Sequence, residues 1–486
     1  MSDELYRPAK YHEDSGERFA RKYPHHHVPF FARPHVGRRE FFKLAAAGLT
    51  GSYLARPALA ADIRTAGVTT QNTAKNCIFI HLVGAIAHTD TFDLKNLPGI
   101  TPPGFNPTPI NGIEWPIGLL PKLGGHLNDV AIIRSMSAWA LVHPLAQTWI
   151  QIGRNPAAAL GDIAPNAGCV VAIEKEHERL PGQVFPAFFG LNAAAAAGPG
   201  YFGAAYAAFQ VNAPRGGSAT IPNTANTRGQ TEFNAMYARL RQYDDALRLG
   251  APYGTSLSDM DKLYGQARGM MYSQAVTDAF TMLAADQNRY GVNGVATTFG
   301  NSCLLAKQIL AANQGTRFVQ INSGGWDHHT DIYGPTNLPL RGAELDSGLG
   351  ALLDDLKGTG KLDETIICVL GEFGRTTGAL SAAGGRDHYL IQSALLAGGG
   401  VKGGKVIGGT NTDGTRPGGT ITNFGWAGSG TTGPRAIRPE DIECTMYSAM
   451  GIDWTTVRYD DPFGRGFEYV PFAKDGQYGP VQELFT

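Results

Sequence analysis

The sequence predicts an α/β fold, in which a doubly wound, mostly parallel sheet carries helices on both faces and cap insertions. Short apolar runs that end in glycine or polar residues alternate with longer stretches of helical character, which is typical of strands joined by crossover helices. The apolar runs are continuous, as expected for strands that are buried on both faces. Polar residues gather directly after several runs, where open α/β sheets bind their ligands.

The expected strands are the apolar runs at 76–84, 129–136, 317–325, 364–374 and 393–400. The expected helices lie between them, at 144–153, 259–286, 300–313 and 338–356. The chain has 486 residues, of which 43% are hydrophobic and 17% are charged. This length and composition suit one large α/β domain with insertions, or two domains.

Two stretches interrupt the alternation of strands and helices. Residues 190–232 are rich in Ala, Gly, Asn and Thr with interspersed aromatics, and we expect them to form an insertion that caps the site. Residues 398–436 are rich in Gly and Thr, and we expect a hairpin and loop there. Neither stretch repeats at a fixed period, which argues against a solenoid.

Charge and cysteine content argue against two classes of protein. The formal net charge of −1 gives no electrostatic basis for nucleic-acid binding. The five cysteines are sparse and show no CxxC spacing, so they do not form the pattern of a small disulfide-stabilised domain.

The first 60 residues are expected to be a leader, separate from the domain at 61–486. Arg38 and Arg39 precede a short apolar run, which closes on the small-x-small sequence ALA at 58–60. The segment resembles a twin-arginine signal, which implies export to the periplasm or the cell exterior; a basic amphipathic N-terminus is the alternative. The run is too short for a good membrane span, and we expect no transmembrane helix beyond the leader.

Four of the expected strand ends are followed by side chains that bind metals or anions. These ends converge in a doubly wound sheet, so we expect the clusters to form one site. Imidazoles together with carboxylates suit Zn, Mn or Fe, whereas carboxylates alone suit Mg or Ca. In chain order the clusters contain His88, Asp90 and Asp93; His143; Asp327, His328 and His329; and Glu372, Arg375, Asp387 and His388.

The segment GGWDHHTD at 324–331 is the densest of these clusters. Asp327 and His329 are two residues apart, so they point to the same side if the segment is extended, and His328 points elsewhere. For each histidine taken alone, a hydrogen-bonded loop residue is the simpler interpretation. The gathering of Asp, His and Glu at successive strand ends favours a metal site.

The motifs GGWDHHTD, GEFGRT and GGRDH, in this order after such a leader, resemble the bacterial domain-of-unknown-function 1501 family. The stretches GGGVKGGKVIGGTNTDG and IRPEDIECTMYSAMGID resemble the C-terminal part of that family, so the resemblance covers roughly 76–453. The family is similar to the alkaline phosphatase and sulfatase superfamily, whose members bind two metals and cleave phosphate or sulfate esters. The resemblance therefore implies an alkaline phosphatase-like fold and divalent metal ions, with Zn, Mn, Mg and Ca as candidates.

The resemblance also implies roles for individual residues. Asp327, His329 and His388 would hold one metal, and Glu372 would serve a second metal where the superfamily has an Asp. Asp90 is the candidate carboxylate ligand from the loop after the first strand.

The chain departs from the superfamily pattern near these positions. Phe373 follows Glu372 where alkaline phosphatases usually have His, and Ala85 stands where a carboxylate is expected. Arg375 is a candidate catalytic residue that could clamp an anionic oxygen. A structural ion pair between Arg375 and Asp387 is the alternative.

His143 is the other candidate catalytic residue. It stands at the start of an expected helix, where the superfamily has a Ser or Thr nucleophile. It could serve as a nucleophile, a proton donor or a metal ligand. We expect the His143 side chain to lie within one side chain's reach of Asp327, Glu372 and His388.

The sequence thus predicts an exported, metal-dependent hydrolase that acts on a small anionic phosphate or sulfate ester. The alternative is a non-catalytic surface protein that keeps the fold as a scaffold and binds a protein partner. The missing hydroxyl nucleophile favours the alternative. A fold alone does not establish a function, so the retained fold does not decide between the two.

Overall fold

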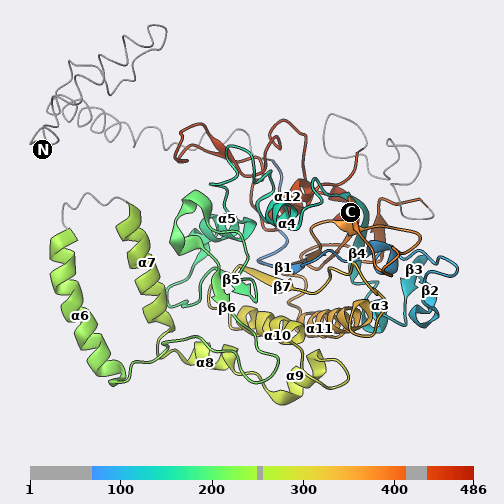
Figure 1. The fold of residues 1–486 in the computed structure, drawn as a ribbon. Helices are drawn as coiled ribbons and strands as arrows, with labels where there is room; N and C mark the ends of the chain where they lie inside the picture. Colours follow the sequence, from blue (N-terminus) through green and yellow to red (C-terminus); the bar gives the residue numbers. More distant parts are fainter. Residues whose placement is uncertain (1–67, 249–254, 412–434) are drawn as a thin grey trace, which may run out of the picture. The chain divides into compact units, whose positions relative to one another are not determined.

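A central sheet of eight strands organises the computed structural model, which describes residues 68–248, 255–411 and 435–486. The order across the sheet is β12-β4-β11-β8-β1-β7-β5-β6. The strands are β1 (Asn76–Leu82), β4 (Val130–Ser137), β5 (Phe188–Leu191), β6 (Phe209–Val211), β7 (Phe318–Ser323), β8 (Thr365–Leu370), β11 (Ile391–Ala397) and β12 (Lys405–Ile407). Figure 1 shows β1 and β7 in the middle of the fold.

The sheet is mostly parallel, which confirms the predicted fold class. β1 pairs in parallel with β7 and β8, β5 with β6 and β7, and β12 with β4. β11 runs antiparallel to its neighbours β4 and β8, and its register shifts between Gln392 and Ala394. An apolar run reveals that a strand is buried but not its direction, so the sequence did not predict this reversal.

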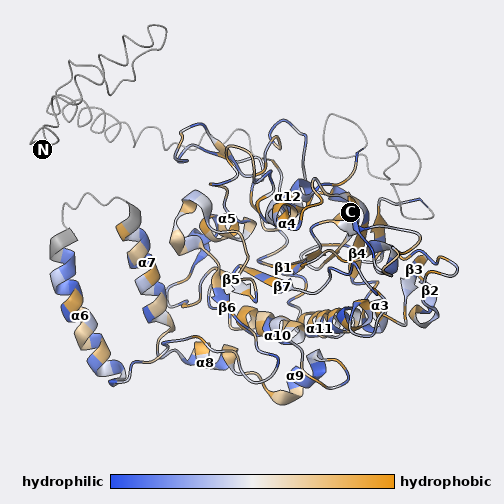
Figure 2. Ribbon diagram, in the orientation of Figure 1, coloured by the Kyte–Doolittle hydropathy of each residue, from blue (hydrophilic) through white to orange (hydrophobic). Residues whose placement is uncertain are grey.

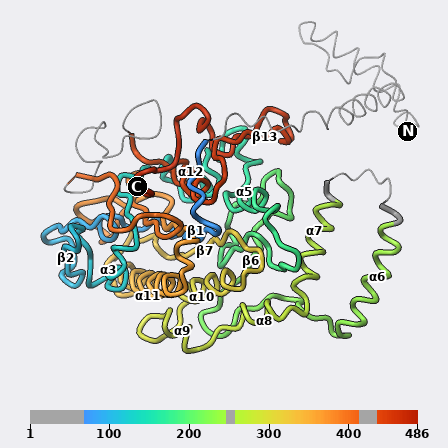
Figure 3. Tube along the Cα trace, turned by 180° about the vertical axis from the view of Figure 1, so that it is seen from behind, coloured from blue at the N-terminus to red at the C-terminus, as the bar shows by residue number. Residues whose placement is uncertain are grey.

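Helices cover both faces of the sheet, as the continuous apolar strands require. Ile78, Ile80 and Leu82 of β1 belong to one apolar cluster, and the alternate residues Cys77 and Phe79 belong to another. The first cluster includes residues of α10 (Thr298–Ala311) and α11 (Leu338–Gly358), and the second includes residues of α5 (Ala167–Glu174) and α12 (Pro439–Ala449). Figures 1 and 3 show these two pairs on opposite sides of β1 and β7.

The remaining elements surround this core. Figure 2 shows orange, hydrophobic ribbon in the central strands and mixed colours on α6 and α7. No helix in the described ranges is long and apolar enough to cross a membrane. The α-helices and strands not yet named are α3 (Pro121–Gly125), α4 (His143–Ile152), α6 (Gly229–Arg248), α7 (Thr255–Met270), α8 (Gln274–Phe280), α9 (Ala284–Tyr290), β2 (Pro107–Ile110), β3 (Ile113–Pro116), β9 (Gly374–Arg375), β10 (His388–Tyr389), β13 (Val457–Arg458) and β14 (Phe467–Glu468).

Two expectations about individual segments need correction, and two others lie wholly or largely outside the described residues. The single helix expected at 259–286 is divided among α7, α8 and α9, and Tyr272 between α7 and α8 has a φ of 58°, which a continuous helix does not allow. Residues 188–211 include β5 and β6, so part of the expected cap at 190–232 extends the sheet. Within 398–436, β12 joins the sheet in parallel with β4, and most of the expected hairpin and loop, at 412–434, lies outside the described residues. The expected leader at 1–60 lies outside the described residues.

Candidate metal centre

The candidate metal centre lies where the carboxyl ends of β1, β7 and β8 meet. Because these strands are parallel neighbours, the loops that follow them converge. The loop after β7 carries Asp327 and His329, β10 begins at His388, and α4 begins at His143. Gly84 after β1 lets the loops approach, because a Cβ at this position, whose φ is 106°, would lie 2.6 Å from the Asp327 backbone nitrogen.

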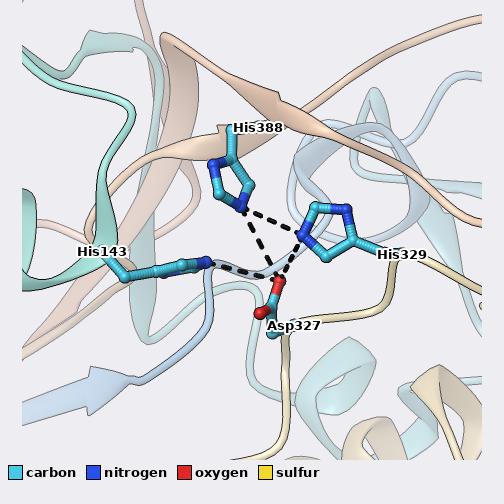
Figure 4. A group of neighbouring side chains, drawn as sticks. All are labelled: His143, Asp327, His329 and His388. Carbon is cyan, nitrogen blue, oxygen red and sulfur yellow. Dashed lines mark hydrogen bonds and ion pairs between the residues drawn. The ribbon is translucent and has the colours of Figure 1, made fainter.

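Four potential ligands converge at this point. His143, Asp327, His329 and His388 each offer one ligand atom, and these atoms all lie within 4.8 Å of one another. Figure 4 shows three imidazoles around Asp327 Oδ1, which lies 2.9 Å from Nε2 of His329, 3.4 Å from Nε2 of His143 and 3.8 Å from Nε2 of His388. Within the described ranges, no other group of three or more such side chains meets this distance criterion.

The three imidazoles are oriented in the same way. Each has its Nδ1 atom against an oxygen acceptor, and a neutral ring with its proton on Nδ1 offers a lone pair on Nε2. Metal-binding histidines are commonly oriented by such contacts. The contacts join Nδ1 of His143 to Oε1 of Glu372 at 2.6 Å, Nδ1 of His329 to Oδ1 of Asp387 at 2.8 Å, and Nδ1 of His388 to the Leu141 carbonyl oxygen at 2.7 Å.

The Nε2 lone pairs point toward a shared position that suits a cation. Nε2 of His329 lies 3.1 Å from Nε2 of His388; when neither nitrogen carries a proton, the two lone pairs repel each other and favour a cation between them. Nε2 of His143 is buried and has no hydrogen-bond partner. Three imidazole nitrogens and one carboxylate oxygen fit Zn, Mn or Fe better than Mg or Ca, which prefer oxygen ligands.

Glu372, which was expected to serve a second metal, lies behind His143 and outside the group of four potential ligands. Its Oε1 also accepts a hydrogen bond from Nε2 of Gln147 at 3.0 Å, and its Oε2 lies 3.1 Å from Nε2 of His81. The Gly84 backbone N–H donates to Oε1 at 3.0 Å. Burial acts to raise the pKa of Glu372, but the hydrogen bonds from His143 and His81 outweigh it and hold the pKa well below its usual range. Glu372 is therefore a fixed anion that orients His143.

The hydrogen bond to Glu372 also changes the proton affinity of His143. It raises the pKa of His143, although partial burial acts in the opposite direction. The pKa of His388 is lowered by burial, and its hydrogen bond to the Leu141 carbonyl only partly opposes this effect. The two pKa values shift in opposite directions because Nδ1 of His143 contacts a carboxylate, whereas Nδ1 of His388 contacts a neutral peptide oxygen.

Arg375 is buried next to the ligand group and does not form the alternative ion pair with Asp387. Its Nη2 donates to Oδ1 of Asp327, and its Nε donates to the Ala85 carbonyl oxygen at 3.1 Å. Asp387 instead contacts His329. Burial acts to raise the pKa of Asp327, but the Arg375 hydrogen bond outweighs it and lowers the pKa. Asp327 is therefore ionised and able to bind a cation.

Asp90, the candidate ligand from the loop after the first strand, is not part of the group of four potential ligands. Oδ2 of Asp90 accepts from Nε of Arg386 at 2.7 Å, and Oδ1 accepts from the Tyr333 hydroxyl at 2.9 Å. Asp90 and Arg386 are each 1% exposed. The pair is a buried structural ion pair.

Phe373 forms an apolar wall beside two of the imidazoles. Its ring centroid lies 4.7 Å from that of His143 and 4.6 Å from that of His388. It is fully buried and clusters with Ala85, Ala138 and Ala146. A phenyl ring and three methyl groups offer no metal ligand on this side of the imidazoles.

The sequence predicted the orientation of His328 but not the contacts made by His81 and by the Leu141 carbonyl. His328 is buried outside the group and burial lowers its pKa to about 4, in agreement with the expected alternation of side chains. His81, which contacts Glu372, was not predicted; the signal was a lone histidine in the otherwise apolar run of β1. The Leu141 carbonyl was also not predicted, because sequence patterns do not identify backbone ligand contacts.

Comparisons with solved structures found several distant similarities. The lipoteichoic acid synthase LtaP from Listeria monocytogenes shares 11% identity, with 83% of this chain and 77% of that chain covered and a TM-score of 0.35. A protein in the alkaline phosphatase superfamily from Vibrio parahaemolyticus shares 13% identity over 80% and 69% of the two chains, with a TM-score of 0.36. The PsFucS1 sulfatase from Pseudoalteromonas sp. shares 13% identity over 79% and 68%, with a TM-score of 0.35. At these TM-scores, the similarities do not bear on the chemistry of the site.

A search of curated proteins found no match to this sequence. A family model described as "Protein of unknown function (DUF1501)" matches residues 74–470. The match includes all four potential ligands and most of the chain, in agreement with the resemblance of the sequence motifs. The chain therefore belongs to the DUF1501 family.

Proposed function

We propose that this protein is an exported hydrolase of phosphate or sulfate esters that uses one metal ion held by His143, Asp327, His329 and His388. The observation that carries the proposal is the common orientation of the three imidazoles, whose Nδ1 atoms contact oxygens and whose Nε2 atoms meet near Asp327 Oδ1. Three imidazoles are the ligand set of one class of catalytic zinc site, and with Asp327 as a fourth protein ligand the water or ester oxygen would occupy a fifth position. A divalent ion there would polarise an ester oxygen and lower the pKa of an attacking water.

Arg375 supplies a fixed positive charge beside the same position. Its guanidinium is 1% exposed, and Nη1 lies 3.4 Å from Nε2 of His329. A buried cation strengthens binding of an anionic ester oxygen, because the surrounding protein screens the charge less than water does. In this proposal Arg375 attracts the anionic group through its charge, because its nitrogens already donate to Asp327 and to the carbonyl oxygens of Gly84, Ala85 and Arg386.

The position of His143 favours direct attack by water. Its Nδ1 contacts Glu372 and its Nε2 faces Asp327, so neither ring nitrogen is positioned as a free nucleophile. By resemblance, His143 also stands where the superfamily has its Ser or Thr nucleophile. We therefore expect hydrolysis without a covalent enzyme intermediate of the serine or threonine type.

Turnover of simple esters tests the proposed activity. Purified protein supplemented with Zn²⁺ or Mn²⁺ is expected to hydrolyse p-nitrophenyl phosphate or p-nitrophenyl sulfate, and a chelator is expected to stop the reaction. The His328→Ala variant should retain activity and the Asp327→Ala variant should lose it. Stable metal binding without turnover of either ester would instead support the scaffold alternative, for which the Phe373 wall and the absent hydroxyl nucleophile are the supporting features.

The Glu372→Gln variant is expected to bind Zn²⁺ about 10–100-fold more weakly than the wild type, the range typical of outer ligand contacts. The neutral amide keeps the shape of the side chain but removes the anion that orients His143. Titration calorimetry measures the effect, and Glu364→Gln is a matched control because Glu364 bonds to Lys75 and Lys361. Equal Zn²⁺ affinity in Glu372→Gln and the wild type would contradict this role.

Export by the twin-arginine route is part of the proposal and rests on the sequence at 38–60. Replacing both Arg38 and Arg39 by Lys is expected to keep the protein in the cytoplasm, because the paired guanidinium groups form the recognition signal. Cell fractionation followed by immunoblotting measures the distribution. A double variant that is exported as the wild type is would exclude this route.

A further inference from the structure

Exposed apolar side chains border the candidate centre. They lie on the two segments that lead to His143 and follow His388, and we call them the apolar rim. Large exposed apolar groups that gather in one place commonly mark a binding surface, whereas scattered ones need no explanation. The rim consists of Trp139, which is 43% exposed, Leu141 at 38%, Val142 at 60% and Leu390 at 40%.

The rim is joined directly to the ligand group. Val142 immediately precedes His143, and the Leu141 carbonyl oxygen accepts from Nδ1 of His388 at 2.7 Å. The Ala138 backbone N–H donates to the Leu390 carbonyl oxygen at 2.9 Å, which ties the two rim segments together. Three rim residues are thus one or two positions away from a potential ligand or bonded to it.

Trp139 is held in place although it is partly exposed. Its Nε1 donates to both carboxylate oxygens of Glu440 at 3.0 Å, and Trp149 donates to the same carboxylate at 2.9 Å. The Arg438 guanidinium lies 3.9 Å from the centroid of the Trp139 ring. Glu440 is only 4% exposed. Ordering of the rim before binding reduces the entropy that a ligand must overcome.

We propose that the apolar rim binds the alcohol part of the ester and that this part is apolar. The inference rests on the proposed function, because the metal position and Arg375 would hold the anionic group beside the rim. An apolar surface continuous with a cationic centre is complementary to a molecule with an anionic head and an apolar body. A small hydrophilic ester would leave Val142 and Leu390 in water and gain nothing from them.

The size of the expected effect follows from the burial of methylene groups. Each CH₂ that is fully transferred from water contributes about 0.8 kcal/mol, which corresponds to roughly fourfold in affinity. Partial burial against an open rim reduces this factor. We therefore expect affinity to rise about two- to fourfold for each added CH₂ until the chain extends past the rim.

Non-hydrolysable phosphonates test the inference by binding alone. The full-length protein, supplemented with Zn²⁺, is titrated calorimetrically with methyl-, butyl-, hexyl- and phenylphosphonate and with neutral 1-hexanol. Wild-type affinity is expected to increase from methyl to hexyl, and the Val142→Ser/Leu390→Ser variant is expected to lose most of this increase. Leu180→Ser is the matched control, because Leu180 is an apolar residue that is 61% exposed and lies away from the rim. It is bonded to Gln183, whose side chain donates to the Asn313 carbonyl oxygen. Asn313 precedes β7, at the end of the strand opposite to the candidate centre.

The outcomes separate the rim from the proposed activity. Equal affinity for methyl- and hexylphosphonate would overturn the rim inference and leave the ester centre in place. Rim-dependent binding of 1-hexanol without binding of any phosphonate would retain the rim and contradict the proposed function, and no binding of any probe would overturn both. Tighter binding of phenylphosphonate than of hexylphosphonate would indicate that the alcohol part of the ester is aromatic. Tighter binding of hexylphosphonate would indicate that it is aliphatic. A rim variant with altered molecular mass by light scattering would overturn the inference in favour of a protein contact.

Discussion

Titration of the Asp327→Ala and His388→Ala variants with Zn²⁺ is expected to show affinities more than about 100-fold below that of the wild type. Loss of an outer contact typically weakens metal binding about 10–100-fold, and loss of a direct ligand should exceed this range. Removing Asp327 also removes the only carboxylate of the ligand group, and it leaves Arg375 without its acidic partner next to the metal position. Calorimetry at fixed pH measures the affinity, because ligand protonation is coupled to metal binding.

His328→Ala is the control for both variants. Its imidazole lies in the same loop and is buried, but it is not a member of the ligand group. Its Zn²⁺ affinity is expected to match the wild type. If Asp327→Ala and His388→Ala also bind as the wild type does, the four side chains are not the metal ligands.

The Asp90→Ala variant is expected to lose about 3–5 kcal/mol of unfolding free energy, which is the usual effect of removing one partner from a buried ion pair. Arg386 would remain buried without its carboxylate, and the Tyr333 hydroxyl would lose its acceptor. Denaturant unfolding monitored by circular dichroism measures the change. Asp93→Ala is not a suitable control, since Asp93 is itself buried beside Lys95 and Arg134.

The double variant Asp90→Leu/Arg386→Met provides the comparison. Replacing both charges by apolar groups removes the desolvation penalty as well as the attraction, so its stability should lie much closer to the wild type. A loss below about 1 kcal/mol in Asp90→Ala would show that the pair is solvated and would leave Asp90 available for another role.

Most of the central sheet could be predicted because its strands are buried on both faces. The runs that form β1 and β8 are almost entirely apolar, the run of β7 is interrupted by Gln320 and Asn322, and all three are followed closely by glycine. β5 and β6 were missed because they are short and lie in a region rich in Ala and Gly. The direction of β11 depends on pairing with strands distant in the sequence, and local patterns contain no information about it.

The sequence predicted which residues gather at the site, but not the hydrogen bonds that determine their roles. Strand-end position brought Asp327, His329, His388 and His143 into consideration, and the structure brings these four together. Glu372 also follows a strand, but its role depends on the direction of its side chain toward His143. Burial and hydrogen bonding decide such roles, and the spacing of residues along the chain does not determine them.

Measuring the metal content of the purified wild-type protein is the decisive test of the proposed metal site. Elemental analysis after purification without chelators, with the protein concentration determined independently, gives the number of ions per chain. We predict one equivalent of a transition metal such as zinc or manganese, because the described residues provide one group of three imidazoles and one carboxylate. Two equivalents in the same protein, or none after incubation with Zn²⁺ and Mn²⁺ followed by desalting, would contradict the account.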